Sequence, residues 1–107
     1  MEYLIVFMTA SNREEAMKIV RTLLEERLIA CGNIVDSVSS LFWWKGEIEE
    51  EKEVLVIMKS NEKLFKKLPK RVKELHSYDV PEILALPIVD GSSSYLEWLK
   101  RSLEPVN

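Results

Sequence analysis

Three short runs of this sequence are apolar at nearly every consecutive position. They are Tyr3–Met8, Val54–Met58 and Ile83–Val89. Runs of this length that are rich in β-branched and aromatic residues are typical of β-strands. Because successive side chains point to opposite faces of a strand, these strands are apolar on both faces of any sheet that they join. Helices of the same chain can cover one of those faces, so the other face needs a second cover.

Two segments with helical periodicity lie between these strands. The first follows the N-cap candidates Ser11 and Asn12 and is predicted to cover about Asn12–Arg27, with glutamates at capping-box spacing. The second follows Asn61, a further N-cap candidate, and contains Pro69. Since proline has no amide hydrogen and clashes with the preceding turn, we expect this second helix to kink or restart there.

A long hairpin is predicted in the middle of the chain. One strand lies within Ile29–Leu41, a turn falls at Lys45-Gly46, and the returning strand covers Ile48–Lys59. The outer part of the returning strand, Glu47–Glu53, is heavily charged, whereas the part that follows it is apolar. We therefore expect the hairpin to project beyond the body of the molecule.

The element order is βαββαβ, followed by a short last helix that is predicted to be capped by Ser94. This order is typical of the α+β ferredoxin-like fold, a four-stranded antiparallel sheet with helices on one face. Pro87 places the last strand at an edge of that sheet or at a bulge. We expect residues 1–107 to form a single domain. Because the last helix is too short to cover the second face of the sheet, we expect the chain to bury that face against copies of itself.

Charge and composition argue against several classes of partner. The chain has 15 Lys and Arg against 18 Asp and Glu, a net charge of −3. Several basic residues share one predicted helix face, but the acidic balance favours a solvated surface over a nucleic-acid site: Lys63, Lys66, Lys67, Lys70, Arg71 and Lys73. No apolar run approaches the roughly 18 residues of a membrane helix, and the acidic start has no basic region of a signal peptide. A single cysteine forbids an internal disulfide and fits a reducing cytoplasm.

Motifs of nucleotide-binding and hydrolytic enzymes are missing from the sequence. Its 3 glycines are too dispersed for a dinucleotide or phosphate loop. It contains no Gly-x-Ser-x-Gly elbow for a nucleophilic serine. These absences argue against both classes of enzyme, while a hydrolase that uses His76 and Asp79 stays as a further alternative.

Cys31 and His76 are the only cysteine and the only histidine of the chain. Thiolate and imidazole are the ligands that copper and zinc prefer. Asp79 and Glu82 follow His76 in one predicted loop and add carboxylate oxygens as possible ligands. Two other roles stay open: Cys31 as a thiol that only packs, and His76 as an imidazole at a helix C-terminus.

Four aromatic residues are candidates for packing or for subunit contacts. Trp43 and Trp44 precede the hairpin turn, Tyr78 lies in the loop after the histidine, and Trp98 lies on the last helix. Aromatic residues at such positions anchor contacts more often than they bind small ligands. The charged stretch Glu47–Glu53 favours a solvated strand that resists aggregation.

Four segments, in this order and spacing, resemble the CutA divalent-cation tolerance proteins. They are Ala30–Ile34, Phe42–Glu49 together with Glu53, His76–Ile83 and Tyr95–Trp98. The resemblance spans nearly the whole chain. It implies a ferredoxin-like fold assembled as a homotrimer, and a cytoplasmic role in tolerance of divalent metals, copper especially.

The resemblance also carries the metal ligands onto this sequence. His76 matches the family's histidine before the Tyr-x-x-Pro-Glu run, and Cys31 matches its cysteine before Asn-Ile. The sequence departs from relatives that look like copper binders, since Met8 stands where they can have a cysteine and Leu75 where they can have a histidine. Ser77 replaces the usual proline after the histidine.

The sequence thus predicts a trimeric, non-enzymatic protein that binds a divalent metal ion such as Cu(II). His76 is the first expected ligand and Cys31 the second, with Glu82 and Asp79 as oxygen donors. An alternative is a trimeric signalling or adaptor module that binds a small molecule or a protein partner in clefts between subunits.

Overall fold

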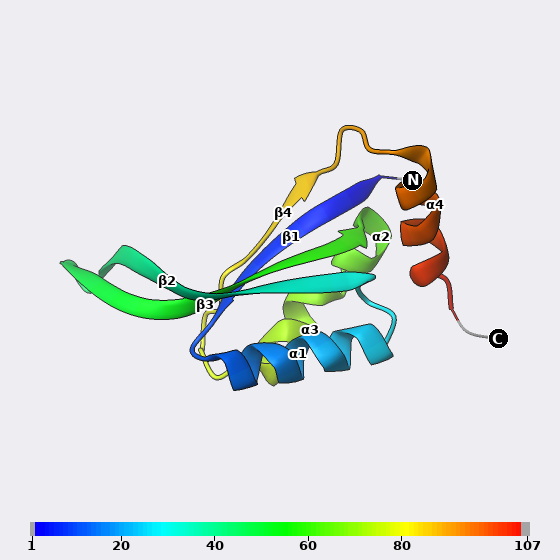
Figure 1. Cartoon of the computed structure of the whole chain (residues 1–107). Coiled ribbons are helices and arrows are strands. Elements are labelled where there is room, and N and C mark those ends of the chain that lie inside the picture. The colour runs from blue at the N-terminus through cyan, green and yellow to red at the C-terminus, as the bar shows by residue number, and fades with distance from the viewer. Residues whose placement is uncertain (1, 106–107) are drawn as a thin grey trace.

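The computed structural model describes residues 2–105, which fold into helices packed on an antiparallel four-stranded sheet (Figure 1). The strands are β1 (Tyr3–Ala10), β2 (Cys31–Trp44), β3 (Glu47–Asn61) and β4 (Ile83–Pro87). The helices are α1 (Arg13–Glu25), α2 (Glu62–Phe65), α3 (Leu68–Leu75) and α4 (Ser93–Ser102). The strand order β2-β3-β1-β4 confirms the predicted α+β architecture with β1 and β3 at the centre. None of the helices in the described part of the chain is long and apolar enough to cross a membrane.

One face of the sheet forms the main core. The side chains of alternate residues of the central strands point to this face and are buried under α1 and α3, on the lower side of the sheet in Figure 1. From the strands these are Leu4, Val6, Met8, Val54, Val56 and Met58, and from the helices Ala16, Ile19, Leu23, Leu68 and Val72. The alternation of buried and less buried residues along β1 shows that the sheet separates two different environments.

The opposite face of the sheet, which we call the open face, is also apolar. Ile5 and Phe7 of β1 are half-buried there. Phe7 pairs with Leu84 and Ile5 with Leu86 of β4, whose side chains are 60% and 52% exposed. Helix α4 covers only one end of this face, where Leu99 packs in a small second core. The prediction that the central strands are apolar on both faces is confirmed.

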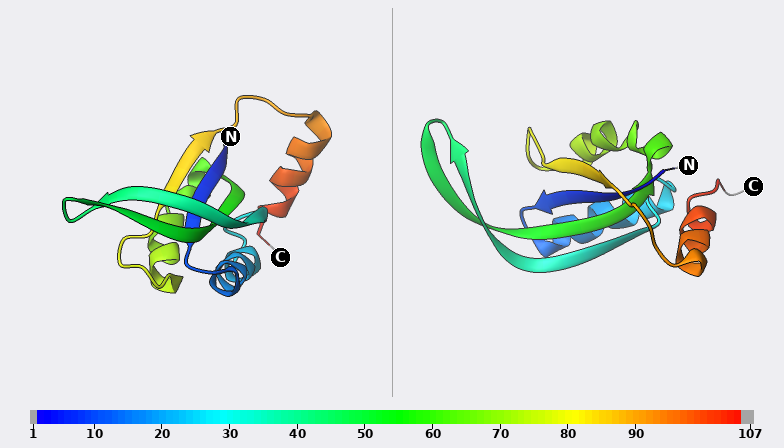
Figure 2. Two further views of the ribbon diagram at one scale, coloured as in Figure 1. Left: turned by 60° about the vertical axis from the view of Figure 1, so that its left-hand side comes forward. Right: turned by 90° about the horizontal axis from the view of Figure 1, so that it is seen from above.

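The hairpin of β2 and β3 extends far beyond the rest of the sheet, as Figure 2 shows from two directions. The pairing shifts register between Val35 and Val38, where Ser37 has a φ of 59°. We call residues 38–53, beyond this bulge, the arm. At its tip Lys45 and Gly46 both have positive φ, 51° and 81°, as a tight turn between two right-twisted strands requires. The projecting hairpin predicted from the charge pattern is thus confirmed.

Several element ends differ from the sequence-based prediction. The cap of α4 is Ser92, whose hydroxyl accepts the Tyr95 N–H at 3.4 Å, and the predicted cap Ser94 lies inside the first turn. Strand β4 ends at Pro87 and does not continue to Val89. These differences arise because several serines in a row offer the same cap chemistry, and because proline cannot donate a ladder hydrogen bond.

Other end signals worked as predicted. Asn61 caps α2, since its side-chain oxygen accepts the Leu64 N–H at 2.8 Å. Pro69 lies in the first turn of α3, so the second helical segment is broken into α2 and α3. Asn12 caps α1 by accepting the Glu15 N–H at 2.8 Å.

Gly32 allows the first prediction. A Cβ atom at this position would lie 2.7 Å from Cγ1 of Val20, a buried residue of α1. We expect Gly32→Ala to lower the free energy of unfolding by about 1–3 kcal/mol, because the packed core must shift to make room. Denaturant unfolding followed by circular dichroism measures this change. Gly91→Ala is the control, since its Cβ would meet Leu96 at an ordinary 3.4 Å.

The double variant Gly32→Ala/Val20→Ala tests the cause. If the contact between the new methyl group and Val20 is responsible, the two losses are not additive and the double variant is less destabilised than their sum. Additive losses would contradict this explanation.

Candidate functional site

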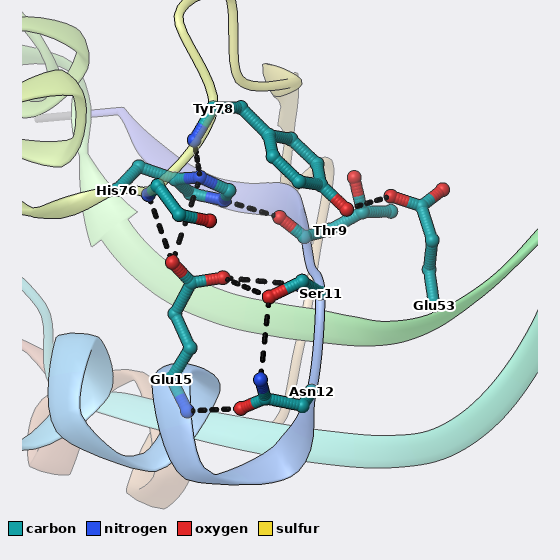
Figure 3. A network of polar contacts seen from close by, with 8 residues as sticks. Thr9, Ser11, Asn12, Glu15, Glu53, His76 and Tyr78 are labelled. Atoms are coloured by element: carbon teal, nitrogen blue, oxygen red, sulfur yellow. Dashed lines mark hydrogen bonds and ion pairs between the residues drawn. The ribbon is translucent and has the colours of Figure 1, made fainter.

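His76 lies at the C-terminal end of α3, where its buried ring is held by two hydrogen bonds (Figure 3). Nε2 is 2.7 Å from the carbonyl oxygen of Thr9, at the end of β1. Nδ1 accepts the Tyr78 N–H at 3.0 Å. Since Nδ1 accepts and a carbonyl oxygen cannot donate, the geometry assigns the proton to Nε2. Both ring nitrogens are therefore engaged within the chain.

Glu15 of α1 connects the start of the helix to the loop that follows His76. One carboxylate oxygen, Oε1, accepts the N–H and the hydroxyl of Ser11 at 3.0 and 2.9 Å. The other, Oε2, accepts the Ser77 N–H at 2.8 Å and lies 4.0 Å from Nδ1 of His76. Burial opposes ionisation of this carboxyl group, but the hydrogen bonds from Ser77 and Ser11 outweigh it and lower its pKa to about 2.

Tyr78 covers the histidine and faces the arm. Its ring lies 4.6 Å from that of His76, and its hydroxyl donates to Oε2 of Glu53 at 2.9 Å. Burial, the hydrogen bond to Glu53 and the nearby negative charges raise the pKa of Tyr78 to about 12. The phenol is therefore a protonated donor at neutral pH, and it ties the loop to the base of the arm (Figure 3).

A groove of about 1160 Å³ lies between the arm and the loop that carries Tyr78. We call it the arm groove. Its lining carries several carboxylates from the two sides: Glu49, Glu51, Glu53, Asp79 and Glu82. The one lysine on the lining, Lys52, donates to Oγ of Ser39 at 2.7 Å. Phe42 and Trp44 add apolar surface to the same groove.

The structure places the predicted ligands in two different regions. Asp79 and Glu82 line the arm groove, and His76 lies behind it under Tyr78. Cys31 pairs with Lys59, which pairs with Ile5, and its Sγ lies 3.9 Å from the hydroxyl of Tyr95. His76 contacts Thr9, which lies four residues after Ile5 on β1. At the rise of a strand, Ile5 and Thr9 are about 13 Å apart along β1.

One chain therefore does not bring Cys31 and His76 together. Within residues 2–105 no group of three or more His, Cys, Asp or Glu side chains is placed to hold a metal ion.

The aromatic candidates occupy three places. Trp43 and Trp44 lie on the arm and are 72% and 55% exposed. Trp98 of α4 packs against Tyr95 with a ring separation of 5.4 Å and remains partly exposed. Tyr78 is the one of the four that is fixed within the chain by a side-chain hydrogen bond.

Two residues of the site, Glu15 and Glu53, were not predicted as site residues. Glu15 carries a visible signal, its capping-box spacing from Asn12, but nothing in the sequence shows that its second oxygen reaches the Ser77 N–H. Glu53 is buried where the charged part of β3 meets the apolar part. A charge at such a boundary is the signal that could have identified it.

With this geometry in view, known proteins give a consistent comparison. The family of the CutA1 divalent ion tolerance protein matches residues 4–102. The divalent-cation tolerance protein CutA of Pyrococcus horikoshii is 48% identical over 96 residues, which are 90% of this chain and 93% of that protein. This chain belongs to the CutA1 divalent ion tolerance family.

Further CutA proteins differ in length and in stated location. The chloroplastic protein CutA 1 of Oryza sativa is 42% identical over 99 residues, 92% of this chain, and this chain spans only 56% of its length. The structure described as the periplasmic divalent cation tolerance protein CutA from Archaeoglobus fulgidus superposes with a TM-score of 0.92 at 38% identity, and covers 95% of this chain and 99% of that one. The CutA fold is thus shown both by sequence and by structure.

The low pKa of Glu15 generates the second prediction. Its folded-state pKa of about 2 lies below the ordinary value of 4.5, so its ionised form stabilises the folded state. This stabilisation is complete above pH 4.5 and is lost as the pH falls from 4.5 toward 2. Glu15→Gln removes the charged acceptor and is expected to lower the free energy of unfolding at neutral pH by about 1–2 kcal/mol.

The measurement is denaturant unfolding at a series of pH values. The Glu15→Gln variant should lose less stability than the wild type across the acidic window, because it has no carboxylate to protonate there. Glu14→Gln, in the same helical turn but exposed, is the matched control and should follow the wild type. Equal pH dependence in Glu15→Gln and the wild type would contradict the assignment.

Proposed function

We propose that this protein binds divalent cations, Cu²⁺ among them, as a homotrimer in the cytoplasm and does not catalyse a reaction. Membership of the CutA family supports the relation to divalent cations. The observation that carries the proposal is the arm groove, whose lining includes Asp79 and Glu82 of the loop and Glu53 of the arm.

The cation site is proposed to be completed by a second subunit. Carboxylates from one chain supply some oxygen ligands but no full set, as the described residues contain no cluster of three placed side chains. Ligation by His76 requires Nδ1 to give up the hydrogen bond from the Tyr78 N–H, since Nε2 is buried against Thr9. Cys31 joins such a site only where a neighbouring subunit brings it close. Because a thiol must lose its proton before it ligates a metal ion, cation uptake at a site that includes Cys31 releases protons.

The trimer is supported by the apolar surface that one chain leaves uncovered. Leu84 and Leu86 stand exposed beside the half-buried Phe7 and Ile5 on the open face, and Trp43 stands exposed on the arm. Soluble monomers rarely expose continuous apolar patches larger than a few hundred Å². Burial of this face against copies of the same chain removes it from water, and the arm can reach a neighbouring subunit.

The third prediction tests cation binding. We expect Cu²⁺ to bind the wild type in a calorimetric titration, and Asp79→Asn/Glu82→Gln to bind it at least about tenfold more weakly, since two proposed oxygen ligands lose their charge. Glu25→Gln/Glu104→Gln removes the same charge from exposed positions outside the groove and should bind like the wild type. Equal affinity of the Asp79/Glu82 variant and the wild type would contradict the proposed site.

The same titration of the His76→Ala variant shows whether His76 ligates the metal ion or only supports the fold of the loop. The buried ring also holds Thr9 and Tyr78, so the variant is expected to lose about 2–4 kcal/mol of stability whatever its role. Isotherms that match those of the wild type, from protein shown to be folded by circular dichroism, would remove His76 from the ligand set.

The fourth prediction tests the assembly. Light scattering at micromolar concentration should give three times the chain mass of 12.5 kDa. Leu84→Arg/Leu86→Arg is expected to lower that mass, because it places two charges on the open face. Met17→Arg, which charges an exposed apolar position of α1, should leave it unchanged. A wild-type mass equal to one folded chain would refute the trimer.

A further inference from the structure

A second concave surface lies on the helical side of the molecule, between the end of α1 and the junction of α2 with α3. It is an open depression with a volume of about 410 Å³, and Leu28 is among its lining residues. We call it the basic pocket, because Lys66, Lys67, Lys70 and Arg71 lie on its lining. It shares no lining residue with the arm groove, so it is separate from the proposed cation site.

The two carboxylates on this lining are both bound to Arg71. Its guanidinium contacts Glu26 through Nη2–Oε2 at 2.7 Å and Nε–Oε1 at 2.9 Å, and Glu74 through Nη1–Oε1 at 3.4 Å. The hydrogen bond from Arg71 holds the pKa of Glu26 below its ordinary value. One arginine thus neutralises much of the negative charge of the pocket and joins α1 to α3.

The three lysines keep their charge available. Among residues 2–105 no carboxylate forms an ion pair with Lys66, Lys67 or Lys70. The lining therefore carries four cationic and two anionic side chains in a protein whose net charge is −3. The net negative charge of the protein does not predict this local excess of positive charge. The excess favours the binding of an anion in the basic pocket.

The break between the two helices brings these groups to one place. Because Pro69 restarts the helix, Lys66 and Lys67 lie in the link and Lys70 lies in the first turn of α3. Lys67 occupies the N-cap position of α3, and no side chain caps this helix end. The partial positive charge of a helix N-terminus then adds to that of the ammonium groups.

We propose that the basic pocket binds a small anion that carries several phosphate charges, such as a polyphosphate or the phosphate chain of a nucleotide. Three lysines on the lining of one pocket match an anion with at least two negative charges. The cavity has room on the order of ten water molecules, enough for linked phosphates. Leu28, a buried residue, also lies on the lining and adds apolar surface to the pocket.

The experiment is a calorimetric titration of the metal-free protein with inorganic tripolyphosphate in a chelator-treated buffer. We expect saturable binding to the wild type. Lys66→Gln/Lys67→Gln/Lys70→Gln should bind at least roughly tenfold more weakly, because three charges near the anion are removed. Lys18→Gln/Arg21→Gln/Lys100→Gln removes as many charges from exposed positions outside the pocket and should bind like the wild type.

A comparison of ATP with tripolyphosphate identifies the source of the phosphate. ATP binding with higher affinity than tripolyphosphate supports a nucleotide, and equal affinity supports a free polyphosphate. No saturable binding to the wild type, or equal weakening in the pocket variant and the charge-matched control, would overturn the proposal. The single variants Lys67→Gln and Lys70→Gln give the same test if the triple variant loses its circular dichroism spectrum. No metal ion is present, so failure of this proposal leaves the cation proposal untouched, and the reverse holds as well.

Discussion

The sheet of this protein is apolar on both faces, and its helices are arranged to cover only one. On the covered face, each buried aliphatic side chain contributes about 1.5–3 kcal/mol, and this is the source of most of the stability of the fold. On the open face the same strands place Ile5 and Phe7 beside the exposed side chains of Leu84 and Leu86. Helix α4 is held at one end by Leu99 and cannot reach the rest. The chain thus leaves an apolar surface exposed to solvent, and this is the reason for assigning the proposed cation site to a homotrimer.

At the other end of β1 a polar network performs a different task. The carboxylate of Glu15 accepts the backbone N–H groups of Ser11 and Ser77 and so joins these two segments. The hydroxyl of Tyr78 fixes the loop to Glu53 of β3. This places Asp79 on the lining of the arm groove. His76 holds the same loop to β1 through its ring. His76, expected from the sequence as a metal ligand, therefore supports in the single chain the loop that carries Asp79 and Glu82.

Much of the fold could be predicted from local signals. Hydrophobic periodicity gave the element order, Pro69 gave the break between α2 and α3, and the charge pattern of β3 gave the projecting arm. These features depend on residues that are close in the sequence and on the alternation of side chains along it, and both can be seen in a single sequence. The exact cap of α4 was missed, since Ser92 and Ser94 are chemically equal and only the folded backbone selects between them.

The site was less accessible to such reasoning. The pair Cys31 and His76 was singled out by residue type, but strand register places the two at different levels of the sheet. The contact of Glu15 with Ser77 joins residues 62 positions apart, and that of Tyr78 with Glu53 joins residues 25 apart. Such contacts depend on the tertiary arrangement, and the local pattern around each residue carries no trace of the partner.

The two edges of the sheet are protected in unequal ways. Strand β4 is short and ends at Pro87, which cannot donate a hydrogen bond to a further strand. Strand β2 has 14 residues and ends in the exposed Trp43 and Trp44, so its outer part is a long edge that can pair with another chain. The bulge near Ser37 and the glutamates on the neighbouring β3 limit such pairing to a partner of matching shape and charge. A long, selectively protected edge beside an apolar open face thus fits the proposed homotrimer better than open-ended aggregation.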